Sequence, residues 1–277
     1  AMAGGGTPGP VPNPEAKPPS AESTAGPARG SQGAADRWTA PSRARKHESL
    51  WVTKAFLLSR HLSGIMSSMI TVFLIGNIAS GKSSAARYLE SRGAYRIDLD
   101  HECKALYVPG SSLVQRIAHV FGNDVLDDAG GIRAHALARR AFADSASTAR
   151  LEKIVYPALI ERLNELIASL EARLHACSLV IVEVSAPSSF VDAFSLADEV
   201  LAITAPLNVR RDRALLRGMT EADFNARVAI QPSDDALYSL SSAVIENAGT
   251  EEDLHHELDA WAASICSKFS EIGGAHA

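Results

Sequence analysis

The chain has 277 residues, of which 46% are hydrophobic and 21% charged, an ordinary composition for a globular protein. The net charge of −5 is uneven, because residues 1–65 carry eight Lys/Arg and four Asp/Glu and the remainder carries 19 and 28. The acidic balance of the larger part argues against broad nucleic-acid binding, and no apolar run reaches the roughly 18 residues of a membrane span.

Residues 1–46 are rich in Gly, Pro, Ala and Ser and show no hydrophobic periodicity. Such a segment cannot bury enough apolar surface to offset the entropy lost on ordering, so we expect it to be disordered. Residues 49–62 have the composition of a short helix, which suits a membrane or partner helix, part of a transit peptide, or a plain upstream extension. The first predicted strand begins directly at Met69. We therefore expect residues 1–65 to form a disordered extension and residues 66–277 to form the folded domain.

A phosphate-binding loop is predicted at residues 76–83, Gly-Asn-Ile-Ala-Ser-Gly-Lys-Ser. Two glycines five positions apart, followed by Lys82 and Ser83, match the spacing of a P-loop. The apolar run Met69–Ile75 before it predicts a buried parallel strand, and residues 84–91 predict a helix that ends before Gly93. Strand, loop and helix therefore occur in the order that phosphate binding requires.

The residue types of this loop suit an anionic ligand. Glycines let backbone N–H groups converge on a phosphate, and the helix that follows adds its positive end. Lys82 would reach the β- and γ-phosphates, and the Ser83 hydroxyl would ligate Mg²⁺. The predicted phosphate-binding residues are Gly76, Ala79, Ser80, Gly81, Lys82, Ser83 and Ser84.

The remaining elements alternate between strands and helices. Strands are expected at 94–98, 178–184, 199–203 and 243–246, and helices at 112–121, 133–143, 147–176, 206–217, from Thr220 onward, and from Thr250 to about Phe269. With the strand at Met69, this order predicts an α/β fold with a doubly wound, five-stranded parallel sheet.

Two carboxylates, Asp98 and Asp100, follow the second predicted strand. Ligands bind beyond the carboxyl ends of parallel strands, so an aspartate there suits proton abstraction from an attacking hydroxyl or support of Mg²⁺. A helix-capping role is the alternative for either residue. Glu183, inside the third predicted strand, is either a Walker B-type metal carboxylate or an outward-facing or loop-end residue.

Arg213 and Arg217 lie four residues apart and share one face of the predicted helix 206–217. Such arginines either stabilise the charge of a transferring phosphoryl group from a lid or simply form a solvated face. Three widely spaced cysteines, at positions 103, 177 and 266, form no C-x-x-C pair and suggest free thiols in a reducing cytoplasm.

From about Met69 to Phe269 the chain resembles the dephospho-coenzyme A kinase family. The resemblance rests on residues 73–89 and 92–100, and further on 108–110, 121–126, 137–142 and 244–247. It implies a P-loop kinase fold that transfers the γ-phosphate of ATP, with Mg²⁺, to the ribose 3′-hydroxyl of dephospho-CoA.

The resemblance also implies roles for individual positions. The implied catalytic residues are Asp100 as the base for the 3′-hydroxyl, Lys82, and the lid arginines Arg213 and Arg217. Asn247 would lie beside the adenine of ATP, and Ser83 would contact Mg²⁺; Glu183, a metal candidate from its position in the sequence, stands where the family has an aspartate. Residues 101–176 would form the helical acceptor-binding region and residues 206–235 the lid.

The chain departs from the family pattern on six positions, Ala134, His135, Tyr156, Ser185, Leu237 and Ser242. Most of these belong to the predicted acceptor side or lid. Two alternatives therefore stay open: a kinase of the same fold for another small acceptor, such as a nucleoside monophosphate, and a nucleotide-binding regulator without catalysis. The sequence makes no prediction of oligomeric state.

Overall fold

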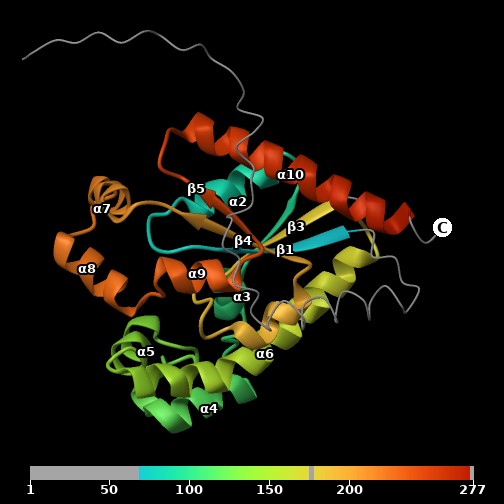
Figure 1. The fold of residues 1–277 in the computed structure, drawn as a ribbon. Helices are drawn as coiled ribbons and strands as arrows, with labels where there is room; N and C mark the ends of the chain where they lie inside the picture. The colour runs from blue at the N-terminus through green and yellow to red at the C-terminus, as the bar shows by residue number, and fades with distance from the viewer. Residues whose placement is uncertain (1–68, 175–177, 275–277) are drawn as a thin grey trace, which may run out of the picture. The chain divides into compact units, whose positions relative to one another are not determined.

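The computed structural model describes residues 69–174 and 178–274. The expected disorder of residues 1–65, the expected helix over 49–62 and the cysteine at position 177 lie outside these residues. A five-stranded sheet occupies the centre of the described domain (Figure 1). Its strands are β1 (Met69–Ile75), β2 (Tyr95–Asp98), β3 (Ser178–Glu183), β4 (Glu199–Thr204) and β5 (Ala243–Glu246).

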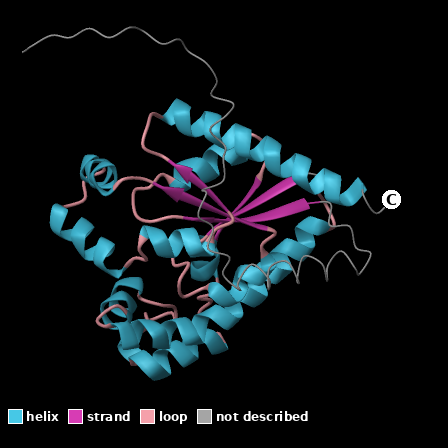
Figure 2. Ribbon diagram, viewed as in Figure 1, coloured by secondary structure: helices cyan, strands magenta, loops and turns pink. Residues whose placement is uncertain are grey.

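The strand order is β2-β3-β1-β4-β5, and every neighbouring pair is parallel. Helices surround the sheet (Figure 2). They are α2 (Lys82–Ser91), α3 (Leu99–Ala105), α4 (Ser112–Phe121), α5 (Ala134–Ala141), α6 (Ser145–Glu171), α7 (Leu207–Leu216), α8 (Glu221–Ile230), α9 (Asp234–Leu240) and α10 (Glu251–Gly274), with 3₁₀ turns at Asn123–Val125 and Val191–Leu196. The predicted doubly wound parallel α/β fold is confirmed.

Side chains of β1 alternate between two apolar cores. Ile70, Val72 and Leu74 pack on one face with buried residues of α2 and α10, whereas Phe73 and Ile75 pack on the other with α6 and α9. Figure 1 shows α2 and α10 on one side of the sheet and α3, α6 and α9 on the opposite side. All seven residues of β1 are buried, which explains why the strand sequence is apolar except for Thr71 and does not alternate.

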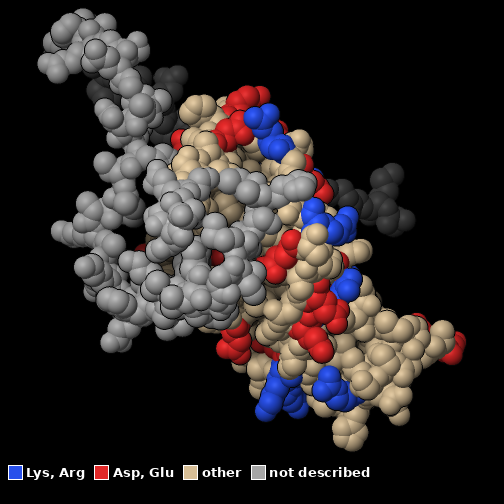
Figure 3. Space-filling model, turned by 90° about the vertical axis from the view of Figure 1, so that its right-hand side faces the viewer, with Lys and Arg blue, Asp and Glu red and all other residues tan. Residues whose placement is uncertain are grey.

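A third apolar cluster joins α4, α5 and the first half of α6. These helices form the region expected to receive the acceptor, and they pack against one another away from the sheet (Figure 1). Within the described residues, no helix combines the length and the apolar character needed to cross a membrane. On the face drawn in Figure 3, acidic and basic side chains are interspersed, and basic residues form no continuous stripe there of the kind that follows a nucleic-acid backbone.

Several expected boundaries were wrong by a few residues, and two helices were missed. The long helix ends at Glu171 and not at 176. Helices α3 and α9 have seven residues each, too few to show a clear 3.6-residue period. Each has a capping signal instead: the Ser233 hydroxyl accepts the N–H of Ala236, and the Asp98 carboxylate caps α3.

The parallel register brings the carboxyl ends of the strands together at one edge of the sheet. Asp98 is opposite Glu183, which is opposite Leu74, one residue before the end of β1. Residues distant in the sequence are therefore neighbours where β1 runs into the predicted P-loop.

Candidate active site

The loop between β1 and α2 has the backbone geometry of a phosphate-binding loop. Ala79 has a φ of 58° and Gly81 a φ of 101°, both in the left-handed region. A Cβ at Gly76 would lie 2.5 Å from the Ile203 carbonyl oxygen, so no side chain fits there. The helix that follows, α2, has no side-chain cap at its N-terminus, which leaves its first N–H groups available to an anion.

The buried amide of Asn247 fixes the underside of this loop. Its Nδ2 donates to the Ser80 carbonyl at 2.8 Å, and Arg213 donates to the Asn247 carbonyl at 2.9 Å and to its Oδ1 at 3.2 Å. Asn247 thus links the P-loop, the end of β5 and α7. The side chain predicted to lie beside adenine has a contact that supports the loop itself.

The far side of the loop is held by residues that follow α8. The backbone N–H of Ile78 donates to Oε1 of Gln231 at 2.9 Å, and Asn77 Nδ2 donates to the Pro232 carbonyl at 3.0 Å and to Asp234 at 3.3 Å. These hydrogen bonds connect the P-loop to the predicted lid. Sequence reasoning assigned them no role, because they join residues more than 150 positions apart.

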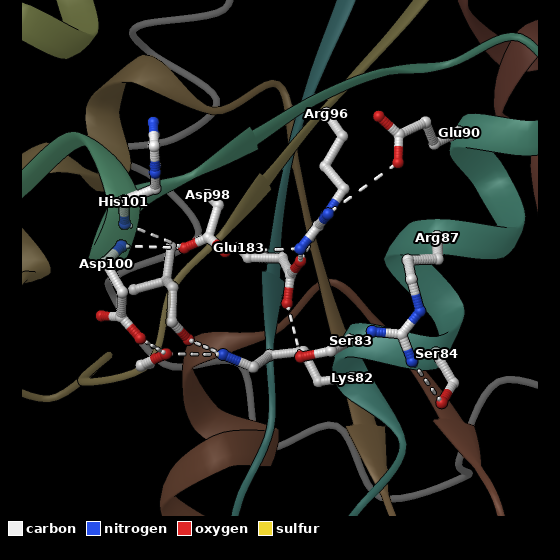
Figure 4. A network of polar contacts seen from close by, with 12 residues as sticks. Lys82, Ser83, Ser84, Arg87, Glu90, Arg96, Asp98, Asp100, His101 and Glu183 are labelled. Atoms are coloured by element: carbon white, nitrogen blue, oxygen red, sulfur yellow. Dashed lines mark hydrogen bonds and ion pairs between the residues drawn. The ribbon is translucent and has the colours of Figure 1, made fainter.

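Lys82 extends from the loop toward the ends of β3 and β2. Its Nζ donates to the Val184 carbonyl at 3.1 Å and to the Ser185 Oγ at 3.0 Å. Burial lowers the pKa of Lys82, while the negative charges of Glu183, Asp100 and Asp98 raise it in part. Figure 4 shows the Lys82 ammonium and the Asp100 carboxylate pointing toward one another.

Glu183 is a buried carboxylate at the end of β3, with 4% of its surface exposed. Its Oε2 accepts the Ser83 hydroxyl at 2.8 Å, and Arg96 binds its Oε1 through Nε and Nη2, each at 2.5 Å (Figure 4). Glu183 is the last residue of β3 and its carboxylate is buried, so it is not an outward-facing residue. Arg96 was given no role from the sequence. Its position two residues before Asp98, on the same side of an edge strand, could have indicated that its side chain lies beside the site.

The pair Ser83 and Glu183 fits Mg²⁺ in chemistry. Both present hard oxygen atoms, and Mg²⁺ in nucleotide sites is held by one or two protein oxygens together with phosphates and water. Among the described residues there is no group of three or more His, Cys, Asp and Glu able to hold a metal by themselves. Ser83 and Glu183 would therefore be two ligands of a metal whose other ligands are phosphate oxygens and water.

The two aspartates after β2 have different contacts. Asp98 Oδ1 accepts the N–H groups of Asp100 and His101 as the N-cap of α3, and its Oδ2 lies 3.3 Å from Arg96. Asp98 therefore has the capping role anticipated for one of the pair. Asp100 is exposed and accepts the Ser185 hydroxyl at 3.0 Å. It remains the aspartate that is available to a ligand.

A cavity of about 610 Å³ lies between the P-loop and helices α7 and α8, within the size range of small-ligand sites. Its lining includes Ile78 and Ala79 of the loop together with Arg217 and Arg227. Arg217 is one of the arginines given a role from the sequence, whereas Arg227 was given none. Burial and the nearby charge of Arg217 lower the pKa of Arg213, so two positive groups approach each other beside the loop.

Two other predicted phosphate-binding residues, Ser80 and Ser84, make contacts within the protein. Ser80 is fully buried, and its backbone N–H donates to the Asn77 carbonyl at 3.1 Å while its carbonyl accepts Asn247, so this residue supports the shape of the loop. The Ser84 hydroxyl accepts a hydrogen bond from Arg87 at 3.4 Å. Among the departures from the family pattern, Leu237 is fully buried in the core and the Ser242 hydroxyl accepts the Val200 N–H at 3.0 Å.

The remaining departures lie in the helical region. Ala134 and His135 are exposed at the start of α5, and Tyr156 donates to Glu152 at 3.1 Å. Tyr156 also packs edge-on against Phe190. Leu237, Ser242 and Tyr156 thus make contacts within the fold.

The fold is a parallel sheet whose central strand leads into a P-loop. A lysine and a carboxylate lie at that end of the sheet, and a cavity lined in part by two arginines lies between the loop and helices α7 and α8. These features define a P-loop kinase. A family model for dephospho-CoA kinase matches residues 70–253. The chain belongs to the dephospho-CoA kinase family. As a kinase it uses ATP as phosphoryl donor, and the predicted family and enzyme class are confirmed.

Individual relatives agree with this assignment. The dephospho-CoA kinase of Corynebacterium diphtheriae is 34% identical over 66% of this chain and 91% of its own length. That of Anaeromyxobacter dehalogenans is 35% identical over 71% of this chain and 92% of its own. A crystal structure of TT1252 from Thermus thermophilus has 28% identity and a TM-score of 0.53, covering 70% of this chain and 97% of that one.

The contact between Gly81 and Asn247 gives a matched test of loop geometry. A Cβ at Gly81 would overlap Asn247 Nδ2, whereas Gly93 has the same φ of 101° and nothing within 4 Å of its Cβ. Gly81→Ala should weaken ATP binding at least tenfold, because the added Cβ displaces the loop. Gly93→Ala is the control, because it adds only the backbone strain of roughly 1–2 kcal/mol. Titration calorimetry with ATP and thermal melts compare the two. Equal ATP affinities would contradict the role given to this contact.

Proposed function

We propose that the enzyme transfers the γ-phosphate of ATP to the ribose 3′-hydroxyl of dephospho-CoA, giving coenzyme A. Membership of the family supports this substrate. The single observation that carries the chemistry is the convergence of Lys82, from the P-loop, and Asp100, from the first turn of α3 after β2, through Ser185. Donor phosphate and acceptor hydroxyl would meet between them.

In the proposed reaction, the 3′-oxygen forms a bond to the γ-phosphorus as the bond to the β-γ bridging oxygen breaks, and ADP leaves. Asp100 accepts the hydroxyl proton as general base. Lys82, with Arg213 of α7 and Arg217 at the C-cap of that helix, stabilises the negative charge on the transferring phosphoryl oxygens. Asn247 and Gln231 keep the loop in the shape that holds the phosphates, which positions the donor for in-line attack.

Mg²⁺ is part of the proposal. Ser83 and Glu183 would hold it, and it would neutralise charge on the β- and γ-phosphates. Arg96 keeps the Glu183 carboxylate oriented toward Ser83. We further propose the cytoplasm as the site of the reaction, since Cys103 is a free thiol of the kind kept reduced there.

The acceptor is tested by a turnover assay. With saturating Mg·ATP, dephospho-CoA should raise ADP release well above the rate with nucleoside monophosphates, because the acceptor must fit beside Asp100 to react. A coupled ADP assay over an acceptor panel measures this. Preferential stimulation by a nucleoside monophosphate would favour the rival kinase, and no stimulation by any acceptor would favour the non-catalytic regulator.

The base is tested by a matched pair of substitutions. Asp100→Asn should lower kcat by roughly 10²-fold or more with ATP affinity nearly unchanged, as expected for a lost general base. Asp98→Asn keeps an oxygen for the α3 cap and should stay within about threefold, because Arg96 retains its contact with Glu183 when the longer 3.3 Å contact with Asp98 is weakened. Steady-state kinetics on both variants decide the assignment. Activity of Asp100→Asn within about twofold of the unsubstituted chain would rule it out.

We also propose that residues 66–277 hold the complete kinase domain, with the acceptor-binding region at about 101–176 and the lid at about 206–235. The family match over residues 70–253 supports this division. A chain of residues 66–277 should therefore retain kcat and both KM values within about twofold. Side-by-side kinetics of the two lengths measure this, and a large loss in the shorter chain would contradict it.

A further inference from the structure

Ser185 joins the two halves of the site. Its hydroxyl accepts the Lys82 ammonium at 3.0 Å and donates to Oδ2 of Asp100 at 3.0 Å. The residue lies just beyond β3 and is one of the positions at which this chain departs from the family pattern. The site residues described above therefore have a connection that neither the P-loop nor the Asp-x-Asp element supplies.

The direction of these hydrogen bonds is fixed by the chemistry of the three groups. A lysine ammonium only donates, and a carboxylate only accepts. The one proton of the Ser185 hydroxyl must therefore point to Asp100. Hydrogen bonds to an ionised acceptor are stronger than neutral ones, so this contact holds the carboxylate in one orientation.

Asp100 depends on this contact because its carboxylate is otherwise little restrained. The side chain is exposed, and within the described residues the Ser185 hydroxyl is the hydrogen-bond donor found on it. Ser185 binds Oδ2, which leaves Oδ1 as the oxygen available to a hydroxyl of the proposed acceptor. An exposed aspartate without such a partner would sample several rotamers.

The backbone at Ser185 is itself well placed to act as a fixed support. The N–H of the preceding residue, Val184, donates to the Leu74 carbonyl of β1 at 3.0 Å, and its carbonyl accepts Lys82. Val184 is buried, so the sheet pairing continues to the residue before Ser185. The hydroxyl is thus presented by the first residue after this pairing, at the start of the β3–β4 connection, where the backbone on one side is held by the sheet.

We propose that Ser185 is a positioning residue for phosphoryl transfer: it orients the Asp100 carboxylate toward the acceptor hydroxyl and keeps it beside the P-loop lysine. The inference rests on the proposed function, in which Asp100 is the base. Ser185 acts through Asp100 and has no separate contact with the transferring phosphoryl group.

The test is a double-mutant cycle in the full-length chain. Ser185→Ala should lower kcat about tenfold, the scale of one lost hydrogen bond to a charged group, with the KM values for ATP and dephospho-CoA within about twofold. Ser185→Thr, which keeps the hydroxyl, should recover most of the activity. In the Asp100→Asn background, Ser185→Ala should cost almost nothing more, because residues that act as a unit are not additive.

The control is Ser195→Ala, since Ser195 is an exposed serine in the same β3–β4 connection whose hydroxyl reaches only the Asp192 carbonyl at 3.4 Å. It should leave kcat unchanged, and thermal melts should show all variants folded. An equal loss from Ser185→Ala in both backgrounds, an unchanged kcat, or a loss confined to the KM for ATP would each overturn the inference. Absence of acceptor-dependent turnover in the unsubstituted chain would instead contradict the proposed function.

Discussion

The site is built around a carboxylate that the fold buries at the end of a central strand. Removing a charged group from water is costly unless it is paired and hydrogen-bonded, and Glu183 satisfies this through Arg96 on one oxygen and Ser83 on the other. Because these partners come from β2 and α2, the same contacts that stabilise the buried charge also fix the start of α2 against the sheet edge. The position of Lys82, one residue before Ser83, follows from that arrangement.

The P-loop is a strained segment that other parts of the chain hold in place. Left-handed backbone at Ala79 costs free energy and persists only where surrounding contacts compensate. Asn247 supplies one such contact from the end of β5, and Gln231 supplies another from the end of the lid helices. A movement of the proposed lid that changed the Gln231 contact would therefore act directly on the backbone of the P-loop.

The departures from the family pattern become easier to interpret once their contacts are known. Leu237 of α9 packs in the apolar core, and the Ser242 hydroxyl hydrogen-bonds Val200 of β4. Both side chains therefore contribute to the stability of the fold. Ser185 differs from them because its hydroxyl lies between the proposed base and the P-loop lysine. Tyr156 and the exposed start of α5 border the helical region where the proposed acceptor would bind.

The sequence by itself determined the parallel α/β fold, the P-loop and the carboxylates at its edge, because these depend on local patterns: apolar runs, glycine spacing and residues directly after strands. It missed the short helix α9, whose seven residues show no full period, and gave Arg96 and Gln231 no role. Only the tertiary structure decided that Asp98 caps a helix while Asp100 stays exposed, and that Asn247 supports the loop. Those outcomes depend on hydrogen bonds between strand ends and helices far apart in the chain, and the register of the sheet sets which of these groups meet.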